Sequence, residues 1–280
     1  MTFQQDPDRE NIPQALAEPQ PALEAKPLPP RETWRLRDLL LFIGFVGVAM
    51  IIVLVCNVVV SVAYVILAPL VGWTMPIFEL QKNAIYLLTM QMVWYALLLA
   101  YIYFLVAVYY RLPFWKGLKW QKLTANNALR YLLGGAVLSL AVLIAPRFLP
   151  EKKGFPLEKM FSSSGSAYAI ALFAVLIAPF MEELLFRGLL FAFFEKHGGL
   201  RFAIVSTALL FAGLHIPEYW GAWQSLIMIL VVGIVFSTVR GLTRSVTPSY
   251  ILHVAYNGSQ MLLLYVQTQH FHKFPGVPHF

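Results

Sequence analysis

Three charged residues interrupt an apolar run in the stretch APFMEELLFRG, residues 178–188. Glu183 and Arg187 are four residues apart, the spacing at which a carboxylate and a guanidinium pair on one helix face and reduce each other's cost of burial. Glu182 lies about 100° further round the helix and need not share that partner. An unpaired carboxylate in an apolar run predicts a chemical role, whereas a buried pair is typical of structural contacts between helices. The alternative for all three is purely structural.

A proline precedes the acidic residues. Pro179 has no amide hydrogen, so within a helix it removes a backbone hydrogen bond and bends the axis. We expect it to free a carbonyl near Val175 and to open space beside Glu182.

A histidine ends the next apolar segment, FAGLH, residues 211–215. At about 1.5 Å of rise per residue, Glu182 and His215 lie at similar depth on neighbouring antiparallel helices joined by a turn near His197 and Gly198. Contact between the two side chains is therefore geometrically plausible. A carboxylate and an imidazole in a low-dielectric cavity can together hold and deprotonate a water molecule.

A second histidine belongs to HVAYN, residues 253–257. His253 and Asn257 are four residues apart on one helix face, and both can donate hydrogen bonds, which suits a site for a negatively charged oxygen. Either residue alone is typical of interhelical hydrogen bonding, but the pair alongside Glu182 and a second histidine favours a function. The match of Asn257-Gly258-Ser259 to a glycosylation signal lies within an apolar span and is taken as false. The HFH at 270–272 could bind metal, although incidental histidines in an exposed tail explain it better.

The composition shows which elements must position these residues. Of 280 residues, 59% are hydrophobic and 12% charged, and the mean hydropathy is +0.67, which is too apolar for a soluble domain. Several runs reach the roughly 20 apolar residues needed to cross about 30 Å of hydrocarbon. The sequence predicts an all-α polytopic membrane protein with about seven (six to eight) transmembrane helices. The single cysteine, Cys56, excludes an internal disulfide.

The candidate spans follow the apolar runs. The third is short enough to begin earlier, near Thr124. The spans are 39–68, 84–109, 131–145, 167–194, 202–215, 222–239 and 249–266.

The basic residues fall mostly between the apolar runs and form no basic stripe, so nucleic acid is not an expected partner; the lipid bilayer is. Their distribution favours a cytoplasmic N-terminus, in a multi-pass protein of the plasma (inner) membrane. The exception is the loop 147–166, with four positive residues on the opposite side. Segment 111–123 interleaves tryptophans with lysines and is either interfacial or a basic loop with incidental tryptophans.

The three motifs together resemble those of a known family. The set E-E-x-x-x-R (Glu182, Glu183, Arg187), F-x-x-x-H (Phe211, His215) and H-x-x-x-N (His253, Asn257) resembles the CPBP intramembrane proteases, which include the type II CAAX prenyl endopeptidases and the abortive-infection proteins. All three motifs match without a departure, and the resemblance covers residues from about 125 to 266. It implies a helical membrane endopeptidase with its site in a cavity within the bilayer.

The resemblance also implies roles for the motif residues. Glu182 would be the general base, His215 would help to hold the nucleophilic water, and His253 with Asn257 would stabilise the oxyanion. Glu183, Arg187 and Phe211 would support the site. The family has also been described as metalloproteases, in which case Glu182, His215 and His253 would bind Zn²⁺. Two histidines and a glutamate are a legitimate zinc set, but H-E-x-x-H is absent; both mechanisms stay open, and we favour the metal-free one.

The expected organisation has four parts. Residues 1–34 are a Pro-rich, disordered cytoplasmic tail, 35–124 hold the first helices and the interfacial segment, 125–266 form the protease-like core, and 267–280 are a C-terminal tail. A site at membrane depth favours substrates that arrive from the lipid phase, namely membrane peptides or lipidated (CAAX-type) proteins. The alternatives are a non-enzymatic accessory or bacteriocin-immunity protein and a proton-coupled transporter that uses Glu182. The absence of visible internal repeats disfavours the transporter.

Overall fold

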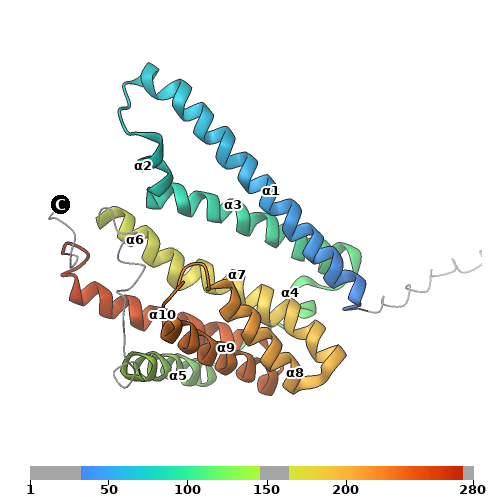
Figure 1. Cartoon of the computed structure of the whole chain (residues 1–280). Coiled ribbons are helices and arrows are strands. Elements are labelled where there is room, and N and C mark those ends of the chain that lie inside the picture. The colour runs from blue at the N-terminus through green and yellow to red at the C-terminus, as the bar shows by residue number, and fades with distance from the viewer. Residues whose placement is uncertain (1–32, 146–163, 274–280) are drawn as a thin grey trace, which may run out of the picture. The chain divides into compact units, whose positions relative to one another are not determined.

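The computed structural model describes residues 33–145 and 164–273. The described chain is helical with no strand, which confirms the predicted all-α class (Figure 1). The tail predicted for 1–34 lies outside the described residues except for its last two. Most of the positively charged loop 147–166 lies outside them as well.

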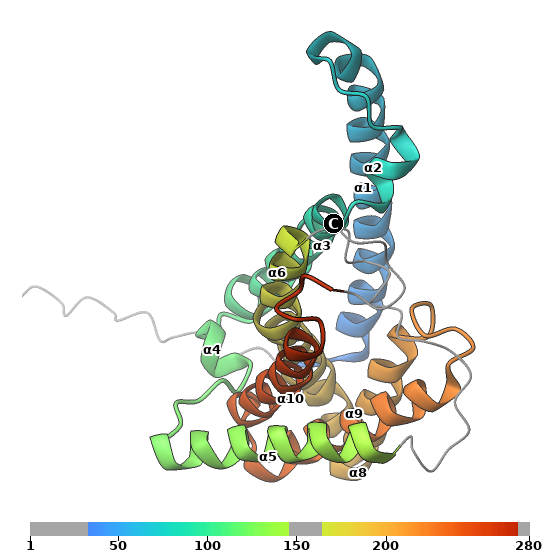
Figure 2. The same cartoon turned by 90° about the vertical axis from the view of Figure 1, so that its left-hand side faces the viewer.

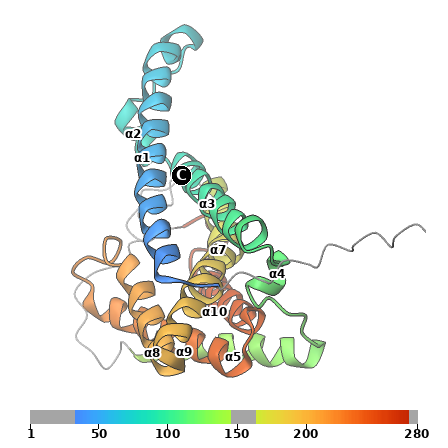
Figure 3. The same cartoon turned by 90° about the vertical axis from the view of Figure 1, so that its right-hand side faces the viewer.

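The N-terminal part is a helical pair with connecting turns. Helix α1 (Leu36–Leu67) leads through the 3₁₀ turn η1 (Ala68–Val71) and α2 (Ile77–Lys82) into α3 (Ala84–Tyr103), which ends in the π-helix η2 (Phe104–Tyr109). Helices α1 and α3 contact each other (Figure 3). Between them, the rings of Phe45 and Tyr101 stack with their centroids 4.4 Å apart. The apolar side chains of α1 are mostly exposed, as expected of a helix that faces lipid.

Helices α5 (Ala125–Ile144) and α10 (Val246–Gln267) pack closely side by side (Figure 2). Thr124 caps α5 by accepting from the amide of Asn127, which confirms the expected early start of this helix. Gly135 permits the close approach, because a Cβ there would lie 2.3 Å from the carbonyl oxygen of Leu252 and 2.6 Å from Cβ of Ala255. Helix α5 therefore supports the helix that carries His253.

Residues 164–190 form one helical stretch with two π-helical segments. They run in the order α6 (Ser164–Leu172), η5 (Phe173–Ile177), α7 (Ala178–Glu182) and η6 (Glu183–Leu190). Helix α8 (Phe191–Leu214) continues from η6, reverses direction at Gly199 (φ 76°), and then contacts α9 (Trp223–Thr243). This reversal forms the helical hairpin that we expected between Glu182 and His215.

Five described segments are long and apolar enough to cross a membrane: Leu36–Val71, Ala84–Tyr109, Ala125–Ile144, Gly165–Leu214 and Trp223–Thr243. The protein is thus a polytopic helical membrane protein. The fourth segment has 50 residues and contains both the fourth and fifth predicted spans, on either side of Gly199. Helix α10, which carries the polar residues of the third motif, is not among the five, so a total of seven crossings stays a prediction.

The segment between η2 and α5 is anchored to the core. It includes the short helix α4 (Phe114–Gly117), and the Trp120 ring packs against Phe180 and Tyr250, with centroids 5.5 and 5.2 Å away. The carbonyl of Lys119 accepts from the amide of Val246 at the start of α10. Its interfacial location stays a prediction, but its aromatic side chains contact the helices that carry the motifs.

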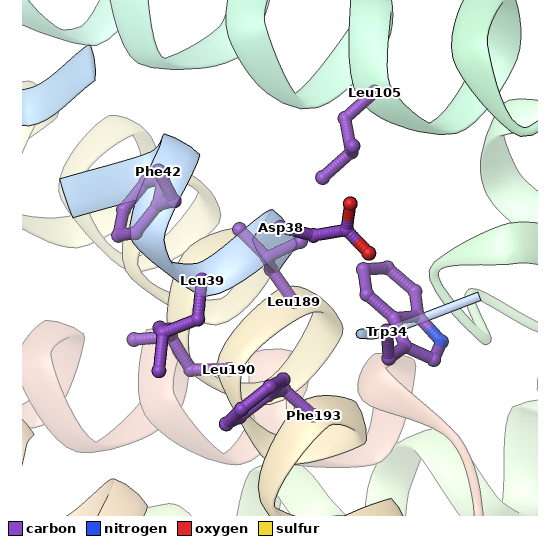
Figure 4. Close-up of a pocket in the computed structure, with 8 residues that line it drawn as sticks. All are labelled: Trp34, Asp38, Leu39, Phe42, Leu105, Leu189, Leu190 and Phe193. Atoms are coloured by element: carbon purple, nitrogen blue, oxygen red, sulfur yellow. The ribbon is translucent and has the colours of Figure 1, made fainter. Parts of the chain in front are cut away.

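A small, mainly apolar cavity lies where the start of α1 meets η2, η6 and α8 (Figure 4). Asp38, which is 4% exposed, is the carboxylate in its lining. Asp38 accepts hydrogen bonds from the Arg35 amide at 2.8 Å and from the Tyr110 hydroxyl. Burial and the Asp38 carboxylate raise the pKa of Tyr110, so its hydroxyl stays protonated and donates. These bonds fix the beginning of α1 against the end of η2.

Candidate active site

A buried polar network joins the first and third motifs. Glu183 and Arg187 in η6 are both 0% exposed, and Glu183 Oε1 accepts from Arg187 Nη1 at 3.0 Å, which confirms the predicted pair. The same Oε1 lies 3.1 Å from Nδ1 of His253, and Oε2 accepts from Ser249 Oγ at 2.6 Å. Because His253 and Ser249 are both on α10, their hydrogen bonds to Glu183 also fix η6 to α10. A buried carboxylate is stable there because each oxygen has a hydrogen-bond partner.

Aromatic rings enclose the guanidinium of Arg187. Its carbon lies 4.6 Å from the centre of the Phe211 ring and 5.3 Å from that of Phe236. Its Nη2 donates to the carbonyl of Gly233 at 3.1 Å. Phe211, the first residue of the second motif, therefore contacts the buried cation directly, consistent with the supporting role expected of it.

Glu182 lies on the opposite side of the His253 imidazole from Glu183. Its side chain is 21% exposed, and Oε2 is 3.7 Å from Nε2 of His253. The buried His253 side chain is therefore placed between two carboxylates, one on each ring nitrogen. Adjacent residues of one helix can reach both nitrogens because they point about 100° apart.

His215 lies at the end of α8, close to this network but not bonded to it. Its Nδ1 is 2.8 Å from the carbonyl oxygen of Phe211, and the two rings are 4.9 Å apart between centroids. The Phe211 ring centroid is in turn 6.0 Å from that of His253. Within the described residues, no hydrogen bond or ion pair joins Glu182 to His215, so their predicted contact stays a prediction. The ion-pair partner that the structure gives Glu182 is His253.

Asn257 connects α10 to η5, the π-helical segment before the acidic residues. Its Nδ2 donates to the carbonyl of Ala174 at 2.8 Å. In η5 the amide of Ala178 donates to the carbonyl five residues back, that of Phe173. With the same spacing the donor to Ala174 would be Pro179, which has no amide hydrogen, so the carbonyl of Ala174 lacks a backbone donor. The carbonyl that Asn257 binds, that of Ala174, is one residue before Val175, near which we expected the freed carbonyl. The difference arises because the helix is π-helical rather than α-helical at this point.

Glu218 is an acidic residue near the site that the motifs do not contain. It follows α8 in the turn before α9, and its charge acts on both His215 and Glu182. Partial removal from water raises the pKa of the Glu218 carboxyl, and the nearby His215 opposes this increase. Its position three residues after His215 is the signal that sequence reasoning could have used.

The described side chains do not fit a zinc site of the expected composition. Oε2 of Glu182 and Nε2 of His253 converge, but the described residues contain no group of three histidine, cysteine, aspartate or glutamate side chains that could hold a metal ion. His215, the third expected ligand, uses Nδ1 for the carbonyl of Phe211, which leaves Nε2 as its metal-binding atom, but it forms no such group with Glu182 and His253 in the described part of the chain. We therefore derive no step that passes through a metal.

Residues 164–259 match the family model described as "Type II CAAX prenyl endopeptidase Rce1-like". The matched region contains all three motifs and the buried network. A match to this model in a polytopic helical protein indicates an enzyme of the intramembrane protease class. Residues 164–259 therefore form a domain of the Rce1-like type II CAAX prenyl endopeptidase (CPBP) family. Searches of curated proteins and of solved structures gave no significant match.

Proposed function

We propose that this intramembrane protease is an endopeptidase that cleaves membrane-associated substrates, including lipidated proteins of the CAAX type, by direct attack of water on the scissile amide. Glu182 is the general base. The observation that carries the proposal is the position of His253, with Nδ1 3.1 Å from Glu183 and Nε2 3.7 Å from Glu182.

The hydrogen bonds indicate where the protons are. Glu183 is ionised opposite Arg187, so Nδ1 of His253 carries a hydrogen and donates it to Oε1. Nε2 therefore faces Glu182. Its distance of 3.7 Å to Oε2 is too long for a direct hydrogen bond but allows one water molecule to contact both atoms.

The charges around His253 favour one shared proton. Arg187 balances Glu183, so the site is electrically neutral when a single proton is on either Glu182 or His253. A low-dielectric site favours such a neutral total. In the form with ionised Glu182 and protonated His253, the first is a base for water and the second presents an Nε2–H donor.

Hydrolysis then follows from these positions. Glu182 removes a proton from the water, the water oxygen bonds to the carbonyl carbon, and the carbonyl oxygen becomes an oxyanion. His253 Nε2–H and the second Nδ2 hydrogen of Asn257 donate to that oxyanion, while His215 helps to hold the water. When the C–N bond breaks, the leaving nitrogen takes the proton from Glu182.

The surroundings of the site favour a substrate that arrives through the membrane. The first motif and Phe211 of the second lie in Gly165–Leu214, one of the segments able to cross a bilayer, and His215 follows directly. A peptide bond reaches this depth when its chain is transmembrane or is drawn to the bilayer by an attached lipid. The family name, which refers to CAAX prenyl substrates, supports a prenylated chain.

The test uses purified protein in lipid vesicles with two peptides of identical sequence. One peptide carries an isoprenoid thioether on a cysteine near its C-terminus, and the other carries a free cysteine. We expect cleavage of the lipidated peptide, detected by mass spectrometry, and much slower cleavage of the soluble one. Failure to cleave any membrane-bound peptide would favour the non-enzymatic accessory role instead, and faster cleavage of the soluble peptide would contradict entry from the lipid phase.

A further inference from the structure

Arg240 in α9 is buried beside the acidic helix but belongs to none of the three motifs. Its side chain is 2% exposed, and its Nε donates to the backbone carbonyl of Arg187 at 2.9 Å. The guanidinium carbon lies 4.9 Å from the centre of the Phe191 ring, the first residue of α8. A charge at this depth is costly, so its contacts require an explanation.

The carbonyl that Arg240 binds is one that the helix leaves unpaired. At the end of η6 the amide of Phe191 donates five residues back, to Phe186, and α8 then continues with the four-residue pattern of an α-helix. When the hydrogen bonds change from a five-residue to a four-residue spacing, one carbonyl receives no backbone donor, and that carbonyl belongs to Arg187. An unpaired buried carbonyl is destabilising, and the Arg240 side chain removes that cost.

The first π segment shows the same arrangement. At the end of η5 the carbonyl of Ala174 is without a backbone donor, and the side chain of Asn257 supplies one from α10. Both π segments that flank α7 are therefore completed by a side chain from another helix. Between the two lies Glu182, the last residue of α7.

Helix α9 holds Arg187 at two points. Gly233 and Arg240 are seven residues apart, about two turns, and so lie on the same helix face. The carbonyl of Gly233 accepts from the Arg187 side chain, and Arg240 donates to the Arg187 main chain. The helices are close here, since a Cβ on Gly241 would lie 2.6 Å from Cδ1 of Leu200.

We infer that Arg240 is a positioning residue: by binding the Arg187 carbonyl it fixes the π-helical register of η6 and hence the placement of Glu182 and Glu183 on the two sides of His253. This inference rests on the proposed function insofar as that placement serves peptide hydrolysis.

The experiment compares Arg240→Met, which has similar length but no donor, with Arg240→Lys, which keeps a charge and a donor. The matched control is Arg244→Met, because Arg244 is exposed at the end of the same helix. In Arg240→Met we expect kcat to fall about 10- to 100-fold with KM unchanged, as for a displaced catalytic group. Arg240→Lys should recover part of that loss, and Arg244→Met should match the wild type.

Hydrogen exchange measured by mass spectrometry provides a readout that does not need activity. In Arg240→Met we expect faster exchange in peptides that cover 184–195 and unchanged exchange in α5. Wild-type kcat in Arg240→Met, no recovery in Arg240→Lys, or exchange that rises equally in α5 would each overturn the inference. A wild-type protein that cleaves nothing would refute the proposed function, while the exchange comparison would still decide the role of Arg240.

Discussion

At the scale of single residues, the site is a chain of buried polar groups in which each member is held by another. Spacing alone predicted the contact of Glu183 with Arg187, because both lie on one helix. The contacts of Glu183 with His253 and Ser249 join residues about 70 positions apart in the chain, so no local sequence pattern predicts them. Spacing could identify the residues with a chemical role but could not say that Glu182 pairs with His253.

Removal of the Ser249 hydroxyl tests the support of Glu183. Its Oγ is 2.6 Å from Oε2 of Glu183, and the side chain is 0% exposed. In Ser249→Ala the carboxylate loses a buried donor, so we expect the free energy of unfolding to fall by about 1–3 kcal/mol. Thermal unfolding in detergent measures this change, with Thr89→Ala, an exposed threonine, as the control. An unchanged unfolding midpoint would show that Oε2 does not depend on this bond.

At the scale of elements, the helices were largely predictable and their interruptions were not. The length of the apolar runs indicated the spans, and Pro179 predicted a freed carbonyl close by. The two π segments depend on contacts with α9 and α10, through Arg240 and Asn257, so no pattern within 164–190 could predict them. The five-residue register explains why the carbonyl bound by Asn257 is that of Ala174 rather than Val175.

The close packing of α5 on α10 should be sensitive to one methyl group. In Gly135→Ala the added Cβ meets the backbone of Leu252 and Cβ of Ala255, neither of which can rotate away. We expect a loss of about 1–3 kcal/mol in stability together with reduced kcat, since α10 carries His253. The control is Gly44→Ala, where a Cβ meets nothing within 4 Å.

The two glycine variants are compared by thermal unfolding and by rate. Equal stability of Gly135→Ala and Gly44→Ala would show that α5 does not constrain α10.

At the scale of the whole molecule, composition was sufficient for the class, because a mean hydropathy of +0.67 cannot be reconciled with a soluble domain. The positive charges predict a cytoplasmic N-terminus. The α3 segment then places Thr74 and Lys122, both exposed, on opposite sides of the membrane.

Single cysteines at these two positions test the orientation in a Cys56→Ala background, since Cys56 is the chain's one cysteine. With a membrane-impermeant maleimide on intact cells, we expect labelling of Thr74→Cys, whereas Lys122→Cys should react only after the membrane is opened. The reverse pattern would place the N-terminus outside.

The central claim is that Glu182 is the base that activates water in this site. The most direct measurement is the cleavage rate of one membrane-bound peptide by the wild type, by Glu182→Gln and by the control Glu79→Gln, an exposed glutamate on α2 that pairs with Lys82. Loss of a general base predicts a decrease of about 10²- to 10⁴-fold in Glu182→Gln, with wild-type folding and a wild-type rate for Glu79→Gln. Full activity of Glu182→Gln would contradict the account.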